Sequence, residues 1–190
     1  TTTLTQKMES ASNSSSRERR RYPCLNMMNS LAVVTTYYNP SRYRTRRINF
    51  EKFKSHMEDS NVKLLTIECV FGDEEPELPP GDDVIHIRAN SVLWQKERLL
   101  NIAARSLPKE IDAVAWIDAD VIFSNKNWVN DTLKVLDESP VAQLFEYCVR
   151  LNKEGSIGIC PDTAESFASV MNRAPASMNV SRYDMHGHTG

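Results

Sequence analysis

Short apolar runs alternate along the chain with amphipathic stretches, a pattern typical of alternating strands and helices. The apolar runs predict buried strands over residues 30–38, 62–71, 84–87 and 112–123. Apolar residues at helical spacing predict helices over residues 42–57 and 92–107. Strands and helices in this succession predict an α/β fold: a doubly wound, mostly parallel sheet with helices on both faces.

Both predicted helices have recognisable ends. Ser41 can cap the first helix, and Asn90 or Ser91 can cap the second, which Pro108 ends. The inner face of the first helix is expected to consist of Tyr43, Phe50, Phe53 and Met57.

The remaining segments are less regular. Beyond the fourth strand the pattern predicts a helix over 129–136, a strand over 141–149 and a short helix over 163–172. The acidic, Pro-rich segment 72–83 is expected to be a surface loop.

We expect two parts in the chain. Residues 1–29, rich in Ser, Thr and Asn, are expected to form a disordered arm, and residues 30–190 one domain. The chain lacks an initiator Met and reaches Gly190 without a closing strand or helix. We therefore expect this domain to be incomplete at its C-terminus.

Composition and net charge limit the kinds of binding partner that we expect. The 190 residues are 41% hydrophobic and 25% charged, an ordinary globular composition. A net charge of -2 gives no general attraction to nucleic acid, so no nucleic-acid partner is expected. No apolar run approaches the roughly 20 residues that cross a bilayer, so we expect no membrane span and a cytoplasmic location.

Two acids interrupt the most apolar of the predicted strands, residues 112–123. Asp118 and Asp120 lie two residues apart, so in an extended chain they face the same side and can bind one cation. Burying an unpaired carboxylate costs several kcal/mol, so the acids indicate a metal, an arginine or the ligand-binding edge of an α/β sheet. The alternative is a chance Asp-x-Asp in a strand-to-loop turn.

A lysine lies on the apolar face of the second predicted helix. Lys96 falls between Leu93 and Leu100, which both belong to that face. Its ammonium can extend past the helix edge to solvent, or it can bind a phosphate at the carboxyl ends of the strands. The pattern alone leaves both interpretations open.

Absent motifs exclude several chemistries. The chain has no Gly-x-x-x-x-Gly-Lys-Ser/Thr loop, no Gly-x-Gly-x-x-Gly and no Gly-x-Ser-x-Gly. Paired carboxylates are hard ligands that suit Mg²⁺ or Mn²⁺, and such a cation can stabilise a departing diphosphate. The sequence therefore favours metal-dependent group transfer from a nucleotide-activated donor.

Three blocks carry a resemblance to a known class. They read Leu-Ala-Val-Val-Thr-Thr-Tyr-Tyr-Asn-Pro (31–40), Trp-Gln-Lys-Glu-Arg-Leu-Leu-Asn (94–101) and Trp-Ile-Asp-Ala-Asp-Val (116–121). They resemble the GT-A class of nucleotide-sugar-dependent glycosyltransferases, and in particular its viral and bacterial members. The resemblance covers roughly residues 30–155. It implies a Rossmann-like GT-A fold and transfer of a sugar, from a UDP-sugar in the first instance, to a saccharide or other hydroxyl acceptor.

The resemblance also implies roles for individual residues. Asp120 is expected to be the catalytic metal ligand for Mn²⁺ or Mg²⁺, while Asp118 meets the ribose or the metal. The nucleoside base of the donor is expected to be bound by Thr35, Thr36 and Tyr37. The diphosphate or the sugar of the donor is expected to be bound by Arg88 and Lys96. Acceptor-binding segments of such enzymes follow beyond the region of resemblance, so the base and the stereochemistry stay open.

The sequence also leaves two other classes of protein open. Asp118 and Asp120 also resemble the nucleophile motif of haloacid-dehalogenase-type phosphatases, in which the first Asp is phosphorylated. Those enzymes have the motif after their first strand and a lysine downstream, whereas Lys96 lies upstream here. The third possibility is a non-catalytic fragment that binds a nucleotide.

Overall fold

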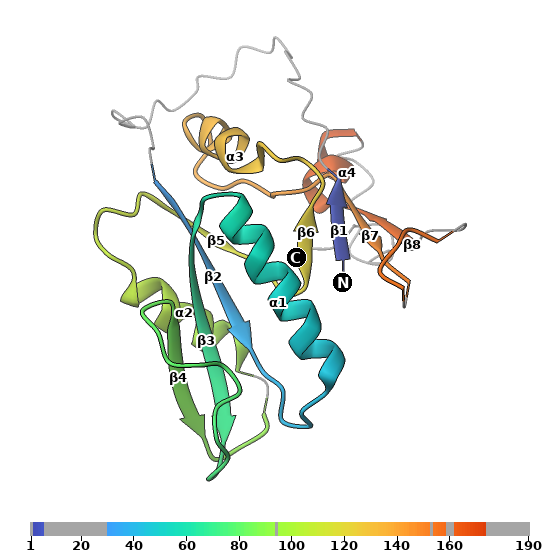
Figure 1. The fold of residues 1–190 in the computed structure, drawn as a ribbon. Coiled ribbons are helices and arrows are strands. Elements are labelled where there is room, and N and C mark those ends of the chain that lie inside the picture. Colours follow the sequence, from blue (N-terminus) through green and yellow to red (C-terminus); the bar gives the residue numbers. More distant parts are fainter. Residues whose placement is uncertain (1, 6–29, 94, 153, 159–161, 174–190) are drawn as a thin grey trace. The chain divides into compact units, whose positions relative to one another are not determined.

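The computed structural model describes residues 2–5, 30–93, 95–152, 154–158 and 162–173, and the chain forms two compact units (Figure 1). Residues 30–122 make up the described part of the first unit apart from Thr2, and residues 123–173 are the main described part of the second. The expected disordered arm over 1–29 lies outside the described residues except for a short strand, β1 (Thr2–Thr5).

A four-stranded parallel sheet forms the centre of the first unit. Its spatial order is β4-β3-β2-β5, and all three neighbouring pairs are parallel. The strands are β2 (Leu31–Tyr37), β3 (Lys63–Phe71), β4 (Val84–Ala89) and β5 (Ala113–Trp116). The predicted α/β architecture with a mostly parallel sheet is confirmed here. The expectation that every apolar run is buried is met by β2 and by most of β3, whereas β4 is partly buried and β5 exposes Val114 and Trp116.

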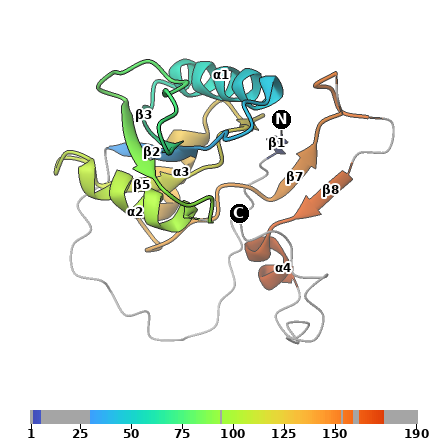
Figure 2. The same cartoon turned by 90° about the horizontal axis from the view of Figure 1, so that it is seen from below.

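Helices cover both faces of this sheet (Figure 2). On one face, α2 (Lys96–Ser106) packs Leu99, Leu100 and Ala103 against Val34, Leu65, Ile67 and Cys69. On the other face lies α1 (Arg44–Asp59), whose Phe50 ring contacts Tyr37 with centroids 4.9 Å apart. Val34 and Tyr37 are three positions apart in β2 and therefore face opposite sides.

The strand order reverses at β2. The chain moves outward from β2 to β3 and β4, then returns through α2 to place β5 on the other side of β2. Right-handed crossovers in opposite directions put their helices on opposite faces, which agrees with the positions of α1 and α2. Open α/β sheets bind ligands outside the carboxyl ends of the strands at such a reversal.

The predicted strand over 112–123 is divided into two. β5 ends at Trp116, and β6 (Val121–Phe123) follows after a turn. Ile117 still donates its N–H to the carbonyl of Val34 at 3.2 Å, whereas Val121 donates to the nearby carbonyl of Asp118 at 3.3 Å. The two acids therefore leave the sheet ladder because the backbone turns on itself, a feature that apolar periodicity does not report.

Both predicted helices begin later than expected. α1 starts at Arg44, and its N-cap residue is Tyr43, with no side-chain cap from Ser41. The side-chain oxygen of Asn39 accepts from the N–H of Tyr43 at 2.9 Å. α2 starts at Lys96, and the preceding Val92 and Leu93 are 70% and 73% exposed. These two apolar residues therefore do not extend the buried face of the helix.

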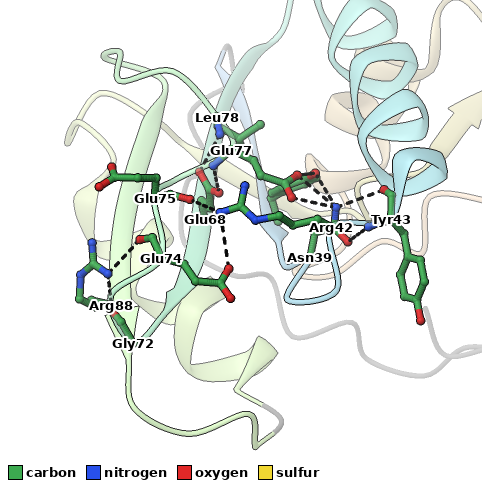
Figure 3. Close-up of polar contacts among 11 residues, drawn as sticks. Asn39, Arg42, Tyr43, Glu68, Gly72, Glu74, Glu75, Glu77, Leu78 and Arg88 are labelled. Carbon is green, nitrogen blue, oxygen red and sulfur yellow. Dashed lines mark hydrogen bonds and ion pairs between the residues drawn. The ribbon is translucent and has the colours of Figure 1, made fainter.

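The crossover between β3 and β4 contains no helix among its described residues 72–83. The expected surface loop is exposed over much of its length, but Leu78 is only 3% exposed. Glu68 of β3 is buried and accepts hydrogen bonds from the N–H groups of Glu77 at 2.6 Å and Leu78 at 3.0 Å (Figure 3). A strand side chain thus holds this loop against the unit.

The described residues 123–173 of the second unit include two helices and a strand pair. The helices are α3 (Trp128–Leu136), at nearly the predicted position, and α4 (Phe167–Arg173). β7 (Tyr147–Arg150) pairs antiparallel with β8 (Asp162–Glu165). The predicted strand over 141–149 is thus confined to its last residues, and the predicted helix over 163–172 begins only at Phe167. The pairing of β7 with β8 decides both boundaries, and a local pattern does not reveal it.

Candidate functional site

A pocket of about 470 Å³ lies within the first unit, at the carboxyl ends of β2 and β5. It is therefore located at the reversal of the strand order, where α/β sheets bind ligands. The end of β2 contributes aromatic residues, α1 and α2 contribute side chains from their first two turns, and the turn after β5 contributes residues 118–120. This volume lies within the range of small-molecule and cofactor sites.

The structure brings the two predicted carboxylates into this pocket. Asp118 and Asp120 both line it, on the turn that separates β5 from β6. The side chain of Asp118 is 50% exposed and Asp120 is half-buried. Two carboxylates on one turn, open to a pocket, are accessible to a ligand in a way that buried structural acids are not.

Lys96 joins them from the start of α2. Its ammonium forms an ion pair with the carboxylate of Asp118, and its side chain is 25% exposed. Lys96 also lines the pocket. Of the two interpretations of this lysine, the observed placement matches the one that brings its charge to the carboxyl ends of the strands.

The predicted base-binding residues occupy different positions. Thr36 and Tyr37 line the pocket, but Thr35 is fully buried and does not. The hydroxyl of Thr35 donates to the carbonyl of Ile117 at 2.6 Å. Thr35 thus ties β2 to the residue that precedes Asp118, and contributes to the site by holding the acidic turn.

Tyr37 is fixed by a polar network that the sequence analysis did not identify. Its hydroxyl donates to the carboxylate of Glu77, which also accepts from the amide of Asn39 at 3.1 and 3.2 Å. Burial, and next the hydrogen bond to Glu77, raise the pKa of Tyr37 to about 12. The Asn39-Pro40 dipeptide signals a turn here, but no local pattern distinguishes Glu77 from its acidic neighbours.

Arg88 lies away from the predicted position. It is not among the residues that line the pocket. Its guanidinium donates to the carbonyls of Gly72 and of Glu74, the latter at 3.0 Å (Figure 3). Together with Arg42, which donates to the carbonyl of Glu75 at 2.9 Å, it anchors the loop after β3.

Arg46 supplies a cation that the sequence analysis did not assign to the site. It lines the pocket from α1 and donates to the carbonyl of Tyr38 at 2.6 Å. Tyr38 in turn packs edge-to-face on Phe71, with ring centroids 5.0 Å apart, and donates to the carbonyl of Val92 at 3.3 Å. The available signal was the position of Arg46 in the first turn of a helix that follows the pocket strand.

The donor atoms of the pocket fit a divalent cation bound jointly with phosphates. Among the described residues no group of three or more His, Cys, Asp and Glu side chains could hold a metal ion by itself. Mg²⁺ is commonly held by one or two carboxylates together with waters and substrate phosphates, so Asp118 and Asp120 suffice for such a site. His186 and His188, which could add ligands, lie outside the described residues.

Comparisons with known proteins add no identification. No family model, no curated protein and no solved structure matches the chain. No helix in the described part of the chain has the length and apolarity that a bilayer crossing requires. The pocket and its residues are therefore the features from which function can be inferred.

Proposed function

We propose that this chain is a metal-dependent glycosyltransferase of the GT-A class that takes its sugar from a nucleoside diphosphate donor, UDP-sugar in the first instance. The observation that carries the proposal is the meeting of Asp118, Asp120 and Lys96 in one pocket with the aromatic end of β2. Aromatic rings, a cation and paired carboxylates match the base, the diphosphate and the bridging cation of such a donor.

Each pocket residue has a defined part in this proposal. Thr36, Tyr37 and the neighbouring Tyr38 contact the nucleoside, and the ammonium of Lys96 donates to phosphate oxygens. Asp118 and Asp120 hold Mn²⁺ or Mg²⁺, and this cation, when bound, neutralises charge on the leaving diphosphate. Arg88 has no part in the proposed donor site because its guanidinium is engaged by the loop after β3.

The transfer step requires a hydroxyl acceptor oriented towards the anomeric carbon. The bond from that carbon to the diphosphate oxygen breaks, a bond to the acceptor oxygen forms, and the acceptor proton passes to a base or to the leaving group. The pocket residues contribute by binding and orienting the donor. The proposal leaves the sugar and the acceptor open.

Calorimetric titration with UDP, with and without Mn²⁺, tests the proposal. UDP should bind in Mn²⁺ and lose roughly tenfold or more of its affinity in EDTA, because the diphosphate would then face two uncompensated carboxylates. Asp120→Ala should weaken UDP binding in Mn²⁺ to a similar degree. Asp82→Ala removes an exposed carboxylate outside the pocket and should leave the affinity unchanged. Equal UDP affinity in Mn²⁺ and EDTA would contradict the proposal.

A further inference from the structure

The ion pair between Lys96 and Asp118 occupies a carboxylate that the proposed cation needs. Both residues line the pocket, and their charged groups are in direct contact. Asp120 is the second carboxylate of the pocket, and among the described residues no ion pair joins it to a basic side chain. A cation entering alone would meet one available carboxylate and one held by a positive group.

We propose that Lys96 makes the binding of the divalent cation and the binding of the diphosphate depend on each other. Without a diphosphate, its ammonium stays on Asp118 and keeps the cation weakly bound. When a diphosphate enters, the ammonium moves to phosphate oxygens and releases Asp118 to the cation. This inference rests on the proposed function, since it concerns the same pocket and the same donor.

Electrostatic repulsion explains why the ammonium of Lys96 should move from Asp118 to the diphosphate. An ammonium and a divalent cation on one carboxylate repel each other, so each weakens the binding of the other. A diphosphate carries enough negative charge to pair with both, and it relieves the repulsion. Lys96 therefore weakens the binding of the cation alone and strengthens the binding of the cation together with the diphosphate.

The position of the pair allows the exchange without unfolding. The side chains of Lys96 and Asp118 are 25% and 50% exposed, and partly exposed ion pairs contribute little to folding stability. Lys96 is the first residue of α2, so its long side chain can turn while the buried face of that helix, around Leu100 and Ala103, stays in place. Lys96 already contacts Asp118 and lines the same pocket, so a diphosphate bound there would lie on the same side of the helix as its ammonium.

Mn²⁺ binding can be followed directly by the electron paramagnetic resonance of the free ion, with no need for activity. In the wild-type chain, Mn²⁺ alone should bind weakly, and saturating UDP should tighten it on the order of tenfold or more. In Lys96→Met, which keeps most of the side-chain volume, Mn²⁺ alone should bind roughly 3- to 10-fold more tightly, since the competing charge is gone. The tightening by UDP should then shrink several-fold. Linkage requires the same change in the effect of Mn²⁺ on UDP affinity.

A matched control is available in the same unit. Lys54 forms a lysine–aspartate ion pair with Asp83 at 2.9 Å, and neither residue lines the pocket. Lys54→Met should leave Mn²⁺ affinity and its tightening by UDP at wild-type values. Lys96→Gln is a second neutral variant, to be used if Lys96→Met does not fold.

The results of these binding experiments distinguish a failure of this inference from a failure of the proposed function. If wild-type chain binds UDP in Mn²⁺ but the neutral Lys96 variants keep the full tightening by UDP, or bind Mn²⁺ alone no more tightly, the inference is overturned and the proposed function stands. If wild-type chain binds no UDP with Mn²⁺, both are overturned. A tighter Mn²⁺ site together with a reduced effect of UDP supports both.

Discussion

Glu77 illustrates how a single residue shapes the pocket without lining it. Its carboxylate accepts from the hydroxyl of Tyr37 and from the amide of Asn39. Asn39 also binds both polar backbone atoms of Tyr43, just before α1 begins. One acidic side chain therefore holds the segment that leads from the end of β2 into α1.

Removal of Glu77 should destabilise the first unit. Glu77→Ala leaves the buried hydroxyl of Tyr37 without its acceptor, at a cost of about 1–3 kcal/mol in the free energy of unfolding, and leaves the Asn39 amide only its weaker contacts to Tyr37 and Tyr43. Urea denaturation measures this cost. Glu75→Ala is the control, because Glu75 is exposed and Arg42 binds its carbonyl rather than its carboxylate. Equal stability of the two variants would exclude the anchoring role of Glu77.

Tyr37 should also make stability depend on alkaline pH. Its pKa in the folded state is raised to about 12 from an ordinary value of 10, because burial and Glu77 disfavour the phenolate. The folded state thus retains the proton where the unfolded state loses it, so this contribution is complete below pH 10 and is lost as the pH rises towards 12. Unfolding measured between pH 9 and 11 should show a steeper loss of stability in the wild type than in Tyr37→Phe. Parallel curves would refute this.

At the scale of elements, the crossover from β3 to β4 is unusual because a loop takes the place of a helix. Glu68 of β3 binds two N–H groups of this loop, and Arg88 of β4 binds two of its carbonyls. Leu78 of the loop itself is buried. The strands thus provide the hydrogen bonds that a helix would have satisfied internally.

Glu68→Gln should loosen this loop. An amide oxygen replaces only one of the two carboxylate oxygens that accept from Glu77 and Leu78, so one buried N–H loses its partner, at about 1–3 kcal/mol. Hydrogen exchange at those two amides should become faster than in the wild type. Glu110→Gln, at an exposed position, should leave their exchange unchanged. Unchanged exchange in Glu68→Gln would exclude this role of Glu68.

At the scale of the first unit, the strand order decides where ligands can bind. Residues 36–38 and 118–120 are about eighty positions apart in the chain, yet they line one pocket because β5 pairs with β2. If β5 had paired beside β4 instead, the acids and the aromatic turn would lie at opposite edges of the sheet. The position of the proposed site is therefore a consequence of topology as much as of residue type.

The sequence by itself determined the class of fold in the first unit and the principal candidates for its site. Apolar runs of strand length alternating with amphipathic stretches permit few arrangements other than a parallel sheet under helices, since the helices then bury the apolar strands. The spacing of Asp118 and Asp120 after such a run was also visible locally. These features depend on neighbouring residues, which a local pattern records.

Only the tertiary structure decided which charged residues meet. Arg88 binds the loop after β3, and Arg46 lines the pocket. Lys96 forms an ion pair with Asp118, and Glu77 accepts a hydrogen bond from Tyr37. The tertiary structure also divided the predicted strand over 112–123, because the backbone turns after Ile117. All of these outcomes have the same physical reason. A long side chain has several charged or polar groups within reach, and a strand has several possible partners. Which of them it contacts depends on residues distant in the chain, which periodicity does not record.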